Sequence, residues 1–377
     1  MVSLMKNLVY FFLIFSLLPL TITARNTIPA RDDKVCKFDA IYQFGDSISD
    51  AGNLIREGPV GARSYAARYP YGESFFRRAT GRCSDGLLMI DYFAMALGLP
   101  FLNPYLESGV SFHQGVNFAV AGSTALPPSF FRERNIHAPS TDSHLNVQLD
   151  WFHRHLNSSC HTLTECRNKL RHSLVFMGEI GGNDYNYAFF QNKPMEEIHT
   201  YVPHVVGAIT HGVREVIRAG AKHIVVPGNF PVGCIPIYLS SFRSQNRRAY
   251  DDMGCLVGLN EFARYHNNYL QGALEQLRRE FPSVVIVYGD YYNAFQSVLR
   301  RSRSLGFDQS SVLRACCGVV GAPYNYDGSR MCGSQGVPVC SDPSRHIHWD
   351  GVHLTQAAYR HMANWLINDF RSAKVQC

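Results

Sequence analysis

Residues 39–53 read Asp-Ala-Ile-Tyr-Gln-Phe-Gly-Asp-Ser-Ile-Ser-Asp-Ala-Gly-Asn. The apolar run at residues 39–44 is typical of a buried strand, and the turn-forming residues that begin at Gly45 end it. Open α/β sheets place their chemistry at the carboxyl ends of strands, so Ser47 is a candidate nucleophile. Serines in such turns also serve as helix caps or turn formers. A catalytic role therefore requires a base, an acid and an oxyanion hole from elsewhere in the chain.

Four further apolar runs of strand length follow, and helical patterns alternate with them. The predicted strands are 116–120, 173–177, 223–226 and 284–288, and the predicted helices are 85–97, 145–156, 203–219, 259–281 and 355–370. Near-continuous apolar strands separated by helices indicate a parallel sheet covered on both faces. The predicted fold class is therefore α/β, with a three-layer α/β/α sandwich. No linker divides the pattern, so residues 25–377 are predicted to form a single domain.

Residues 1–24 have the pattern of a secretory signal peptide: Lys6 precedes a mostly apolar run at residues 8–20, and small residues up to Ala24 offer a cleavage site. The apolar run is shorter than the roughly 20 residues that span a bilayer, and no later stretch is long and apolar enough, so no membrane span is expected. The expected location is secreted, in the apoplast, with the vacuole as the alternative. The sequon at Asn157 (Asn-Ser-Ser) predicts glycosylation on an exposed loop.

The composition is that of a globular protein with a substantial core, because 46% of the 377 residues are apolar and 12% are aromatic. The formal charge of +6 is small for this length, and the chain has no run of five basic residues. Such a surface does not favour nucleic acid as a partner. The expected partner is a small-molecule ester. The oligomeric state is not encoded in these features, and a monomer is assumed.

The chain has 11 cysteines, most of which should pair in an oxidising compartment. The odd number leaves at least one unpaired or intermolecular, and Cys377 is the candidate. Two short-loop pairs fit, Cys160–Cys166 and Cys234–Cys255, while the full connectivity stays open. The cysteine spacings do not match the paired Cys-x-x-Cys hooks of zinc sites, so no metal and no cofactor is predicted.

Near the C-terminus, residues 349–353 read Trp-Asp-Gly-Val-His. On a helical turn, the spacing of three between Asp350 and His353 places both side chains on one side. Asp350 can then hold one ring nitrogen of His353 and leave the other facing a hydroxyl, which is what a serine nucleophile needs. His346 and His348 are rival bases, but neither has an acid placed like Asp350. Both are therefore predicted to lie in a loop or at the rim of the site.

Two further candidates follow predicted strands, as Ser47 does: Gly122 and Asn183. The carboxyl ends of parallel strands share one edge of the sheet, so these three turns can converge there. A purely structural role is the alternative for each residue, because glycine at 122 could serve a positive φ and Asn183 could serve only to form a turn. The chain contains no Gly-x-Ser-x-Gly elbow, Rossmann fingerprint or P-loop, which argues against an α/β-hydrolase, dinucleotide or nucleotide-phosphate site.

Four segments, taken in order, resemble the conserved blocks of the GDSL or SGNH hydrolases. They are Gly45-Asp46-Ser47, Asn117-Phe118-Ala119-Val120-Ala121-Gly122, Gly181-Gly182-Asn183-Asp184 and Asp350-Gly351-Val352-His353. Ile48 stands where the family name has leucine, which leaves the nucleophile untouched. The continuation after Ser47, the cysteines and the Trp-Asp-Gly-Val-His-Leu-Thr run resemble the plant GDSL esterase/lipase branch. Within that branch, the chain is most similar to acetylajmalan esterase-like and sinapine esterase-like members.

This resemblance implies a flavodoxin-like sandwich with about five parallel strands. It also implies Ser47 as nucleophile, His353 as general base and Asp350 as the acid that orients it. The oxyanion hole would consist of the backbone N–H groups of Ser47 and Gly122 and the side-chain amide of Asn183.

Three functions are compatible with these residues. The first is a secreted carboxylester hydrolase that cleaves a small acyl ester, such as one of a plant specialised metabolite, through a Ser47 acyl-enzyme. The second is an acyltransferase, in which an alcohol replaces water; the third is a catalytically silent binding protein. Substrate choice is assigned to loops rich in Tyr, Phe, Arg and Pro, at 54–82, 101–140, 230–252 and 302–348. No amphipathic lid is evident, so the pattern does not support lipase activity.

Overall fold

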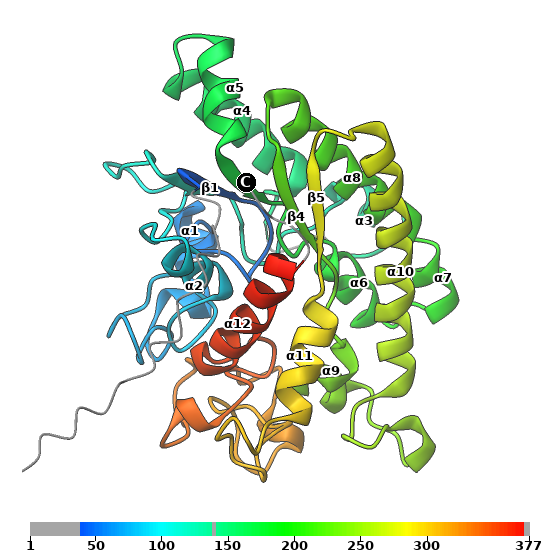
Figure 1. Cartoon of the computed structure of the whole chain (residues 1–377). Helices are drawn as coiled ribbons and strands as arrows, with labels where there is room; N and C mark the ends of the chain where they lie inside the picture. The colour runs from blue at the N-terminus through cyan, green and yellow to red at the C-terminus, as the bar shows by residue number, and fades with distance from the viewer. Residues whose placement is uncertain (1–37, 138–140, 373–377) are drawn as a thin grey trace, which may run out of the picture. The chain divides into compact units, whose positions relative to one another are not determined.

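A computed structural model describes residues 38–137 and 141–372. Five parallel strands form one sheet in the order β2-β1-β3-β4-β5 (Figure 1). They are β1 (Ala40–Gln43), β2 (Gly115–Asn117), β3 (Ser173–Phe176), β4 (His223–Pro227) and β5 (Val285–Gly289). This strand order is that of flavodoxin-like sheets, which bind their ligands where β1 and β3 diverge. The predicted α/β class is confirmed. The predicted signal peptide at residues 1–24 lies outside the described residues.

The strands form where the apolar runs predicted them, and β1 is buried along its whole length. Ile41 pairs with Gly115 of β2 on one side and with Leu174 of β3 on the other. Strand β2 is shorter than predicted, because it ends at Asn117 instead of continuing to residue 120. The Asn117 side chain accepts the N–H of Ala119 at 3.0 Å, which turns the chain out of the sheet.

Two groups of helices lie on either side of the sheet and complete the three layers (Figure 1). One group contains α2 (Met89–Ala96), α11 (Tyr291–Arg300) and α12 (Gln356–Ser372), and the other contains α4 (Leu145–Ser159), α8 (Val202–Ala219) and α10 (Val257–Glu280). Gly220 ends α8 with φ 127°, as its place in the sequence predicted. Helix α2 begins four residues later than predicted, and residues 85–88 form the turn that leads into it.

Several helices escaped the sequence analysis because they are short or lack a clear apolar period. They are α1 (Gly58–Ala62), α3 (Pro128–Arg132), α5 (Leu163–Arg171), α6 (Gly182–Phe189), α7 (Met195–His199), α9 (Pro236–Ser241) and α11. Single 3₁₀ turns are η1 (Leu54–Arg56), η2 (Tyr65–Ala67), η3 (Val232–Cys234), η4 (Arg247–Ala249), η5 (Pro323–Asn325) and η6 (Pro343–Arg345). The predicted loop at 54–82 therefore contains helical turns. Asp290 caps α11 by accepting the N–H of Asn293, and this cap could have identified the helix.

The structure confirms both predicted disulfides, Cys160–Cys166 and Cys234–Cys255. It adds two bridges within the predicted loop 302–348, Cys316–Cys340 and Cys317–Cys332. Among the described residues, Cys83 is buried and free, whereas Cys377, the predicted unpaired cysteine, lies outside them. No helix within residues 38–137 and 141–372 is both long and apolar enough to cross a membrane.

Candidate active site

The ends of β1, β2 and β3 carry Ser47, Gly122 and Asn183. These strands are neighbours in the sheet, with β1 in the middle. Asn183 Nδ2 donates to the backbone oxygen of Ser123 at 2.9 Å, and the Tyr187 hydroxyl donates to the backbone oxygen of Gly122 at 2.9 Å. The structure thus brings the three turns together, as the strand pattern predicted.

The turns that follow β1 and β3 interlock through glycines. Gly45 has φ 136° and Gly178 has φ 74°, conformations that favour glycine. A Cβ atom at Gly178 would lie 1.7 Å from the Phe44 oxygen, so the two backbones approach as closely as glycine permits. The Asp46 N–H donates to the Glu179 oxygen at 3.1 Å across this contact. The close approach fixes the turn of Ser47 against the segment that leads to Asn183.

The carboxylate of Asp50 joins the turn after Ser47 to the turn that precedes Gly122. It accepts backbone N–H groups from residues 52–54, at 2.6, 2.6 and 3.0 Å, and from Ala121 at 2.8 Å. Burial raises the pKa of Asp50 in spite of these four donors. Asp50 is thus a turn cap, and it also connects two strand ends.

Ser47, His353 and Asp350 form one chain of hydrogen bonds. His353 Nε2 lies 2.8 Å from Ser47 Oγ, and His353 Nδ1 lies 2.8 Å from Asp350 Oδ2. An ionised carboxylate only accepts, so Nδ1 carries the proton and Nε2 is left to accept the proton of Ser47. The Tyr71 hydroxyl also donates to Asp350 Oδ2, at 2.8 Å. The arrangement is the one that a serine nucleophile with a general base requires.

The electrostatics of this chain favour an ionised acid beside a basic imidazole. Burial alone would raise the pKa of Asp350, but the charge of His353 and three hydrogen bonds outweigh burial and lower it to about 2. Burial also opposes the charged form of His353, yet Asp350 more than compensates, so the pKa of His353 is raised. Asp350 therefore stays ionised at neutral pH and stabilises the imidazolium that forms when His353 takes a proton.

The turn that holds Asp350 and His353 is not helical, which corrects the expectation of a helical turn. Helix α12 begins only at Gln356. Asp350 Oδ1 accepts the N–H groups of Val352 at 2.9 Å and His353 at 2.7 Å, and Gly351 has φ 89°. The Asp350 side chain thus builds the turn that places His353 beside its other carboxylate oxygen.

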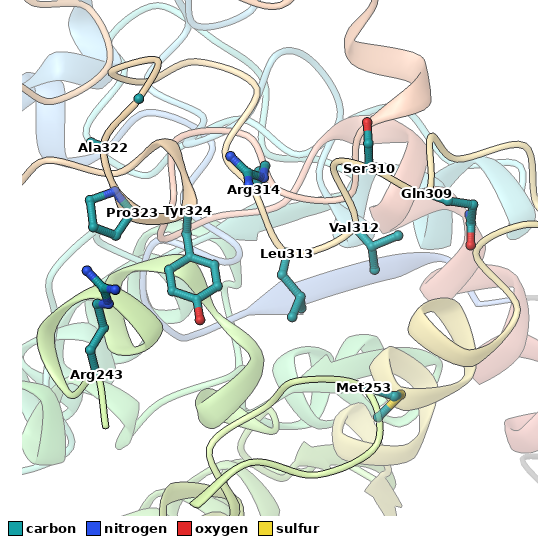
Figure 2. Close-up of a pocket in the computed structure, with 11 residues that line it drawn as sticks. Arg243, Met253, Gln309, Ser310, Val312, Leu313, Arg314, Ala322, Pro323 and Tyr324 are labelled. Atoms are coloured by element: carbon teal, nitrogen blue, oxygen red, sulfur yellow. The ribbon is translucent and has the colours of Figure 1, made fainter. Parts of the chain in front are cut away.

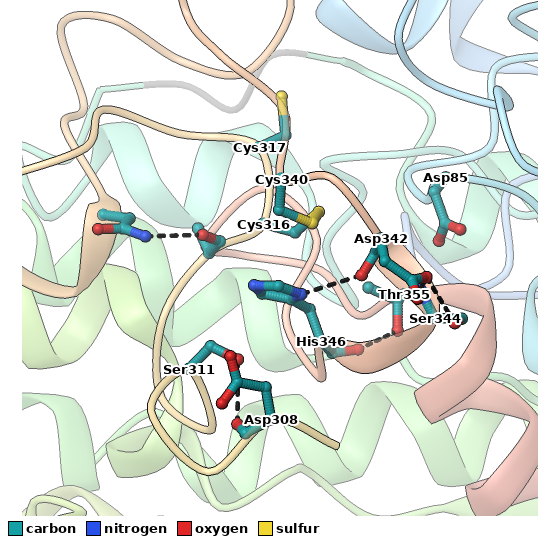
Figure 3. Close-up of a disulfide and its surroundings, with 12 residues drawn as sticks. Asp85, Asp308, Ser311, Cys316, Cys317, Cys340, Asp342, Ser344, His346 and Thr355 are labelled. Atoms are coloured by element: carbon teal, nitrogen blue, oxygen red, sulfur yellow. Dashed lines mark hydrogen bonds between the residues drawn. A yellow bond between two sulfur atoms is a disulfide. The ribbon is translucent and has the colours of Figure 1, made fainter. Parts of the chain in front are cut away.

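The rival histidines are not placed to act on Ser47, since within the described ranges neither ring is hydrogen-bonded to it. His348 lies in a loop between η6 and α12, as predicted, but it is fully buried, with its ring 5.7 Å from that of Phe295, and is therefore not at the rim. Burial lowers the pKa of His348 to about 3. His346 lies beside the Cys316–Cys340 disulfide, with Nδ1 3.1 Å from the Asp342 oxygen (Figure 3).

The side chains of Cys316, Cys340 and His346 offer potential metal-binding atoms within 4.8 Å of one another. The two sulfur atoms are bonded to each other at 2.02 Å, as Figure 3 shows. A disulfide has no thiolate to offer a metal, so this cluster does not fit a zinc site in its oxidised form.

A cavity of ≈ 380 Å³ opens over Ser47 and His353. Its apolar lining comes from residues close to α6, η3, α9 and the C-terminal turn: Ile48, Phe190, Phe230, Val232, Ile235, Ile237 and Val352. Polar groups of Asp46, Glu179, Asn183, Asn186 and Tyr238 line the rest, with those of Tyr187 and Asn229. Of the four loops predicted to select the substrate, 230–252 lines this cavity, and the described residues of the other three do not.

A second cavity, of ≈ 600 Å³, lies between the loops at 230–252 and 302–348 (Figure 2). Arg243, Arg314 and Tyr324 contribute to its lining. None of the predicted catalytic or oxyanion residues lines this cavity. The loop at 302–348 therefore shapes a different part of the surface from the one it was expected to shape.

The Asn183 amide is fully hydrogen-bonded to the protein. Its nitrogen donates to Asp46 Oδ2 at 3.1 Å and to the Ser123 oxygen at 2.9 Å, while its oxygen accepts from Asn186 Nδ2 at 3.1 Å. To donate to an oxyanion as well, one N–H group of the amide must be shared between the oxyanion and its present acceptor, Asp46 or Ser123. By contrast, no hydrogen bond is found from the backbone N–H of Ser47 or of Gly122 to any other residue within the described ranges.

Three residues that support the site were missed by the sequence analysis: Tyr71, Gln148 and Glu179. Gln148, on α4, accepts the Gly45 N–H at 2.9 Å and donates to the Gly45 oxygen at 2.8 Å and to Ser123 Oγ at 2.9 Å. Gln148 is a polar residue on the buried, otherwise apolar face of its helix. A polar residue at such a position usually has a hydrogen-bonding role, and this could have identified Gln148 from the sequence.

The parallel sheet and the Ser47–His353–Asp350 arrangement define the class: an α/β protein with the geometry used in serine-dependent acyl transfer. The model of the family described as GDSL-like lipase/acylhydrolase matches residues 41–366, and the chain belongs to this family. Since its relatives are named as esterases, the protein is a carboxylic ester hydrolase.

Curated relatives match most of the chain. The acetylajmalan esterase of Rauvolfia serpentina is 51% identical over 333 residues, which cover 88% of this chain and 86% of that protein. A GDSL esterase/lipase of Arabidopsis thaliana is 54% identical over 343 residues, 91% of this chain and 92% of that protein. A second Arabidopsis thaliana GDSL esterase/lipase is 44% identical over 367 residues, 97% of this chain and 92% of that protein.

Proposed function

We propose that the protein hydrolyses small acyl esters through an acyl-enzyme on Ser47. The observation that carries this proposal is the continuous chain of hydrogen bonds from Ser47 Oγ through His353 to Asp350, with 2.8 Å at each of its two steps. Ser47 and His353 line a cavity, so an ester carbonyl can reach Ser47 Oγ.

In the first half of the reaction, Ser47 Oγ attacks the carbonyl carbon while its proton passes to His353 Nε2. Asp350 holds Nδ1 and stabilises the imidazolium. The negative charge that develops on the carbonyl oxygen is accepted by the N–H groups of Ser47 and Gly122 and by the Asn183 amide. His353 then gives its proton to the departing alcohol, which leaves the acyl group on Ser47. In the second half, water attacks the acyl carbon while its proton passes to His353. The bond to Ser47 then breaks as His353 returns this proton to Ser47 Oγ, and the acid is released.

The cavity supports a compact substrate. Its volume of ≈ 380 Å³ is at the low end of ligand pockets, which run from about 300 to about 1,000 Å³. Apolar side chains from η3 and α9 face the space beside Ser47, while Asn186 and Tyr238 provide polar contacts. One relative is named for acetylajmalan, and we propose by analogy a small acyl ester of a plant specialised metabolite.

The test compares the wild-type protein with Ser47→Ala in a series of chromogenic acetyl, butyryl and octanoyl esters. We expect Ser47→Ala to lose at least about 10⁴-fold in kcat, because removing the nucleophile leaves only binding and the oxyanion hole. We also expect the acetyl ester to be preferred by the wild type. Ser49→Ala, in the same turn, is the matched control and should keep its activity.

A folded Ser47→Ala protein with wild-type activity would rule out the acyl-enzyme on Ser47. An acyltransferase would have the same residues, so the products are measured with and without an added alcohol. Ester formation that outpaces hydrolysis would replace the hydrolase proposal with a transferase. Binding of the ester without turnover by the wild type would favour a silent binding protein.

We also propose that residues 1–24 are removed during secretion to the apoplast, with the vacuole as the alternative. Residues 25–377 would then form one domain that acts as a monomer. Asn157 is exposed near the C-terminal end of α4, which suits glycosylation. Secreted protein whose N-terminal sequence begins at Arg25, and whose mass falls on treatment with a glycosidase unless Asn157 is replaced, would support this processing. Retention of the leader would contradict it.

A further inference from the structure

Two acidic side chains beside Ser47 have no part in the mechanism above. Asp46 and Glu179 are only 3% and 6% exposed, both line the cavity, and their carboxyl groups are hydrogen-bonded to each other. Burial raises the pKa of both groups. The charge of Glu179 adds to the rise at Asp46, and that of Asp184 adds to the rise at Glu179. Two buried carboxyl groups in such contact favour a state that shares one proton, because two adjacent negative charges repel each other.

The carboxyl of Asp46 connects the nucleophile turn to the Asn183 amide. Its Oδ1 accepts the N–H of Ile48 at 3.0 Å, and its Oδ2 accepts from Asn183 Nδ2 at 3.1 Å. A change in the position or charge of Asp46 therefore acts directly on the amide that is proposed to hold the oxyanion.

The position of Glu179 is set by the backbone around it. Its oxygen accepts the Asp46 N–H at 3.1 Å, and its side chain lies over Gly182, the first residue of α6. A Cβ atom at Gly182 would come within 2.7 Å of Glu179 Oε1. Glycine at this position thus leaves the space that the carboxyl occupies, between the Asp46 turn and the helix that carries Asn183.

No arginine or lysine forms an ion pair with either carboxyl in the described part of the chain. The titratable groups that act on the pair come from several elements: Asp184 on α6, Tyr238 on α9, Tyr291 on α11, Tyr359 on α12, Cys83 and His353. Among them, only His353 can carry a positive charge. Loss of the shared proton would therefore place a second, uncompensated negative charge beside the developing oxyanion.

We propose that Glu179 is a positioning residue that shares one proton with Asp46. The shared proton limits the pair to a single negative charge and keeps the Asp46 carboxyl in place to accept from the Asn183 amide. This inference rests on the proposed function of Ser47 and Asn183. Glu179 itself needs no contact with the reacting atoms.

The experiment measures kcat and KM against pH for the wild type, Glu179→Gln and Glu179→Leu. A glutamine can hydrogen-bond to Asp46 without an ionisable proton, so Glu179→Gln should keep kcat within about threefold at pH 7. Glu179→Leu leaves Asp46 without this partner. It should lower kcat by about tenfold or more with KM within about threefold, a fraction of the loss expected when an oxyanion donor is removed.

The pH profile separates positioning from a merely structural role. The wild type should lose kcat at alkaline pH as the pair releases its shared proton, and Glu179→Gln should not show this alkaline loss. Glu196→Gln, an exposed glutamate on α7, is the matched control and should leave the profile unchanged.

Three results would each overturn the positioning role. Glu179→Leu could keep the wild-type kcat, Glu179→Gln could lose as much kcat as Glu179→Leu, or Glu179→Gln could keep the alkaline loss of kcat that the wild type shows. If Glu179→Leu does not fold, the pH profile of Glu179→Gln decides. Ser47→Ala is measured in parallel: residual wild-type activity there would reject the proposed function, whereas an inactive Ser47→Ala with any of the overturning results would reject only the role of Glu179.

Discussion

The two halves of the candidate site are supported in different ways. Ser47, Gly122 and Asn183 lie at the ends of adjacent strands, where buried side chains join one turn to the next. Asp350 and His353 lie on an irregular turn, against a segment that is cross-linked by two disulfides. The proposed nucleophile and its proposed base are therefore held in position by different kinds of contact. The strand ends depend on many shared hydrogen bonds, whereas the C-terminal turn depends on a few local and covalent ones.

The contact between the disulfide segment and the turn is direct. The N–H of Cys316 donates to the His348 oxygen at 3.0 Å, and the N–H of Cys317 donates to the Trp349 oxygen at 2.7 Å. Each of these cysteines is bridged to a different partner. The residues just before Asp350 are thus held by backbone hydrogen bonds to a cross-linked loop.

The largest effect is expected from Asp350→Asn, because Asp350 both builds the turn and fixes the tautomer of His353. We expect kcat to fall by about 10⁴-fold. The carboxylate raises the pKa of His353, so its removal should lower that pKa and move the acid limb of kcat/KM to lower pH. Asp342→Asn, at the exposed cap of η6, is the control. An acid limb that stays in place or moves to higher pH would contradict this account.

The next effect is expected from the double variant Cys317→Ser/Cys332→Ser. Loss of this bridge should lower the free energy of unfolding by about 2–5 kcal/mol. It should also lower kcat of the folded protein, since the segment supports the turn of Asp350. Chemical denaturation and kinetics of the folded protein check both.

Cys160→Ser/Cys166→Ser is the matched control for the bridge. Its loop is shorter, with a separation of 6 residues against 15, and it lies between α4 and α5. The chain-entropy model gives it a smaller loss of stability, and kcat should not change. An equal effect on kcat from both pairs would show that the disulfide segment has no special link to the base.

The smallest effect is expected from Gln148→Ala at the strand ends. The variant leaves the buried Gly45 N–H without a partner, whereas the Gly45 oxygen keeps the N–H of Val120. The loss should cost about 1–3 kcal/mol of unfolding free energy. The remaining hydrogen bonds of Asp46 and Asp50 should keep Ser47 in place, so kcat should fall by less than about tenfold. Gln271→Ala on α10, whose side chain makes one bond to Asn267, is the control. A loss as large as that of Asp350→Asn would remove the contrast between the two halves.

The sequence predicted the fold because the five strands and the long helices follow clear apolar patterns. It also predicted that Ser47, Gly122 and Asn183 converge, since parallel strands share an edge. Helix α6 was missed because Gly-Gly-Asn-Asp looks like a turn, although it supplies the first residues of a helix. The catalytic and oxyanion roles stay predictions.

The contacts of the supporting residues could not be predicted, because their partners are distant in the sequence. Gln148 contacts Gly45 across 103 residues, and Tyr71 contacts Asp350 across 279. No local pattern records such pairs. The short-loop disulfides were predicted from their spacing. The pairing of Cys316 with Cys340 was not predicted. Cys316 and Cys317 are adjacent in the sequence, so spacing cannot tell which of them pairs with Cys340 and which with Cys332.

The hydrogen bond between Ser47 and His353 joins positions 306 residues apart. A chain made from the N-terminus therefore exposes the turn of its proposed nucleophile early and receives its proposed base only when nearly all of the protein has been synthesised. Any fragment that stops before residue 353 would lack general-base catalysis, however well its first strands had folded. If these roles hold, ester hydrolysis by this protein would report that synthesis has passed residue 353 and that the two ends of the site have met.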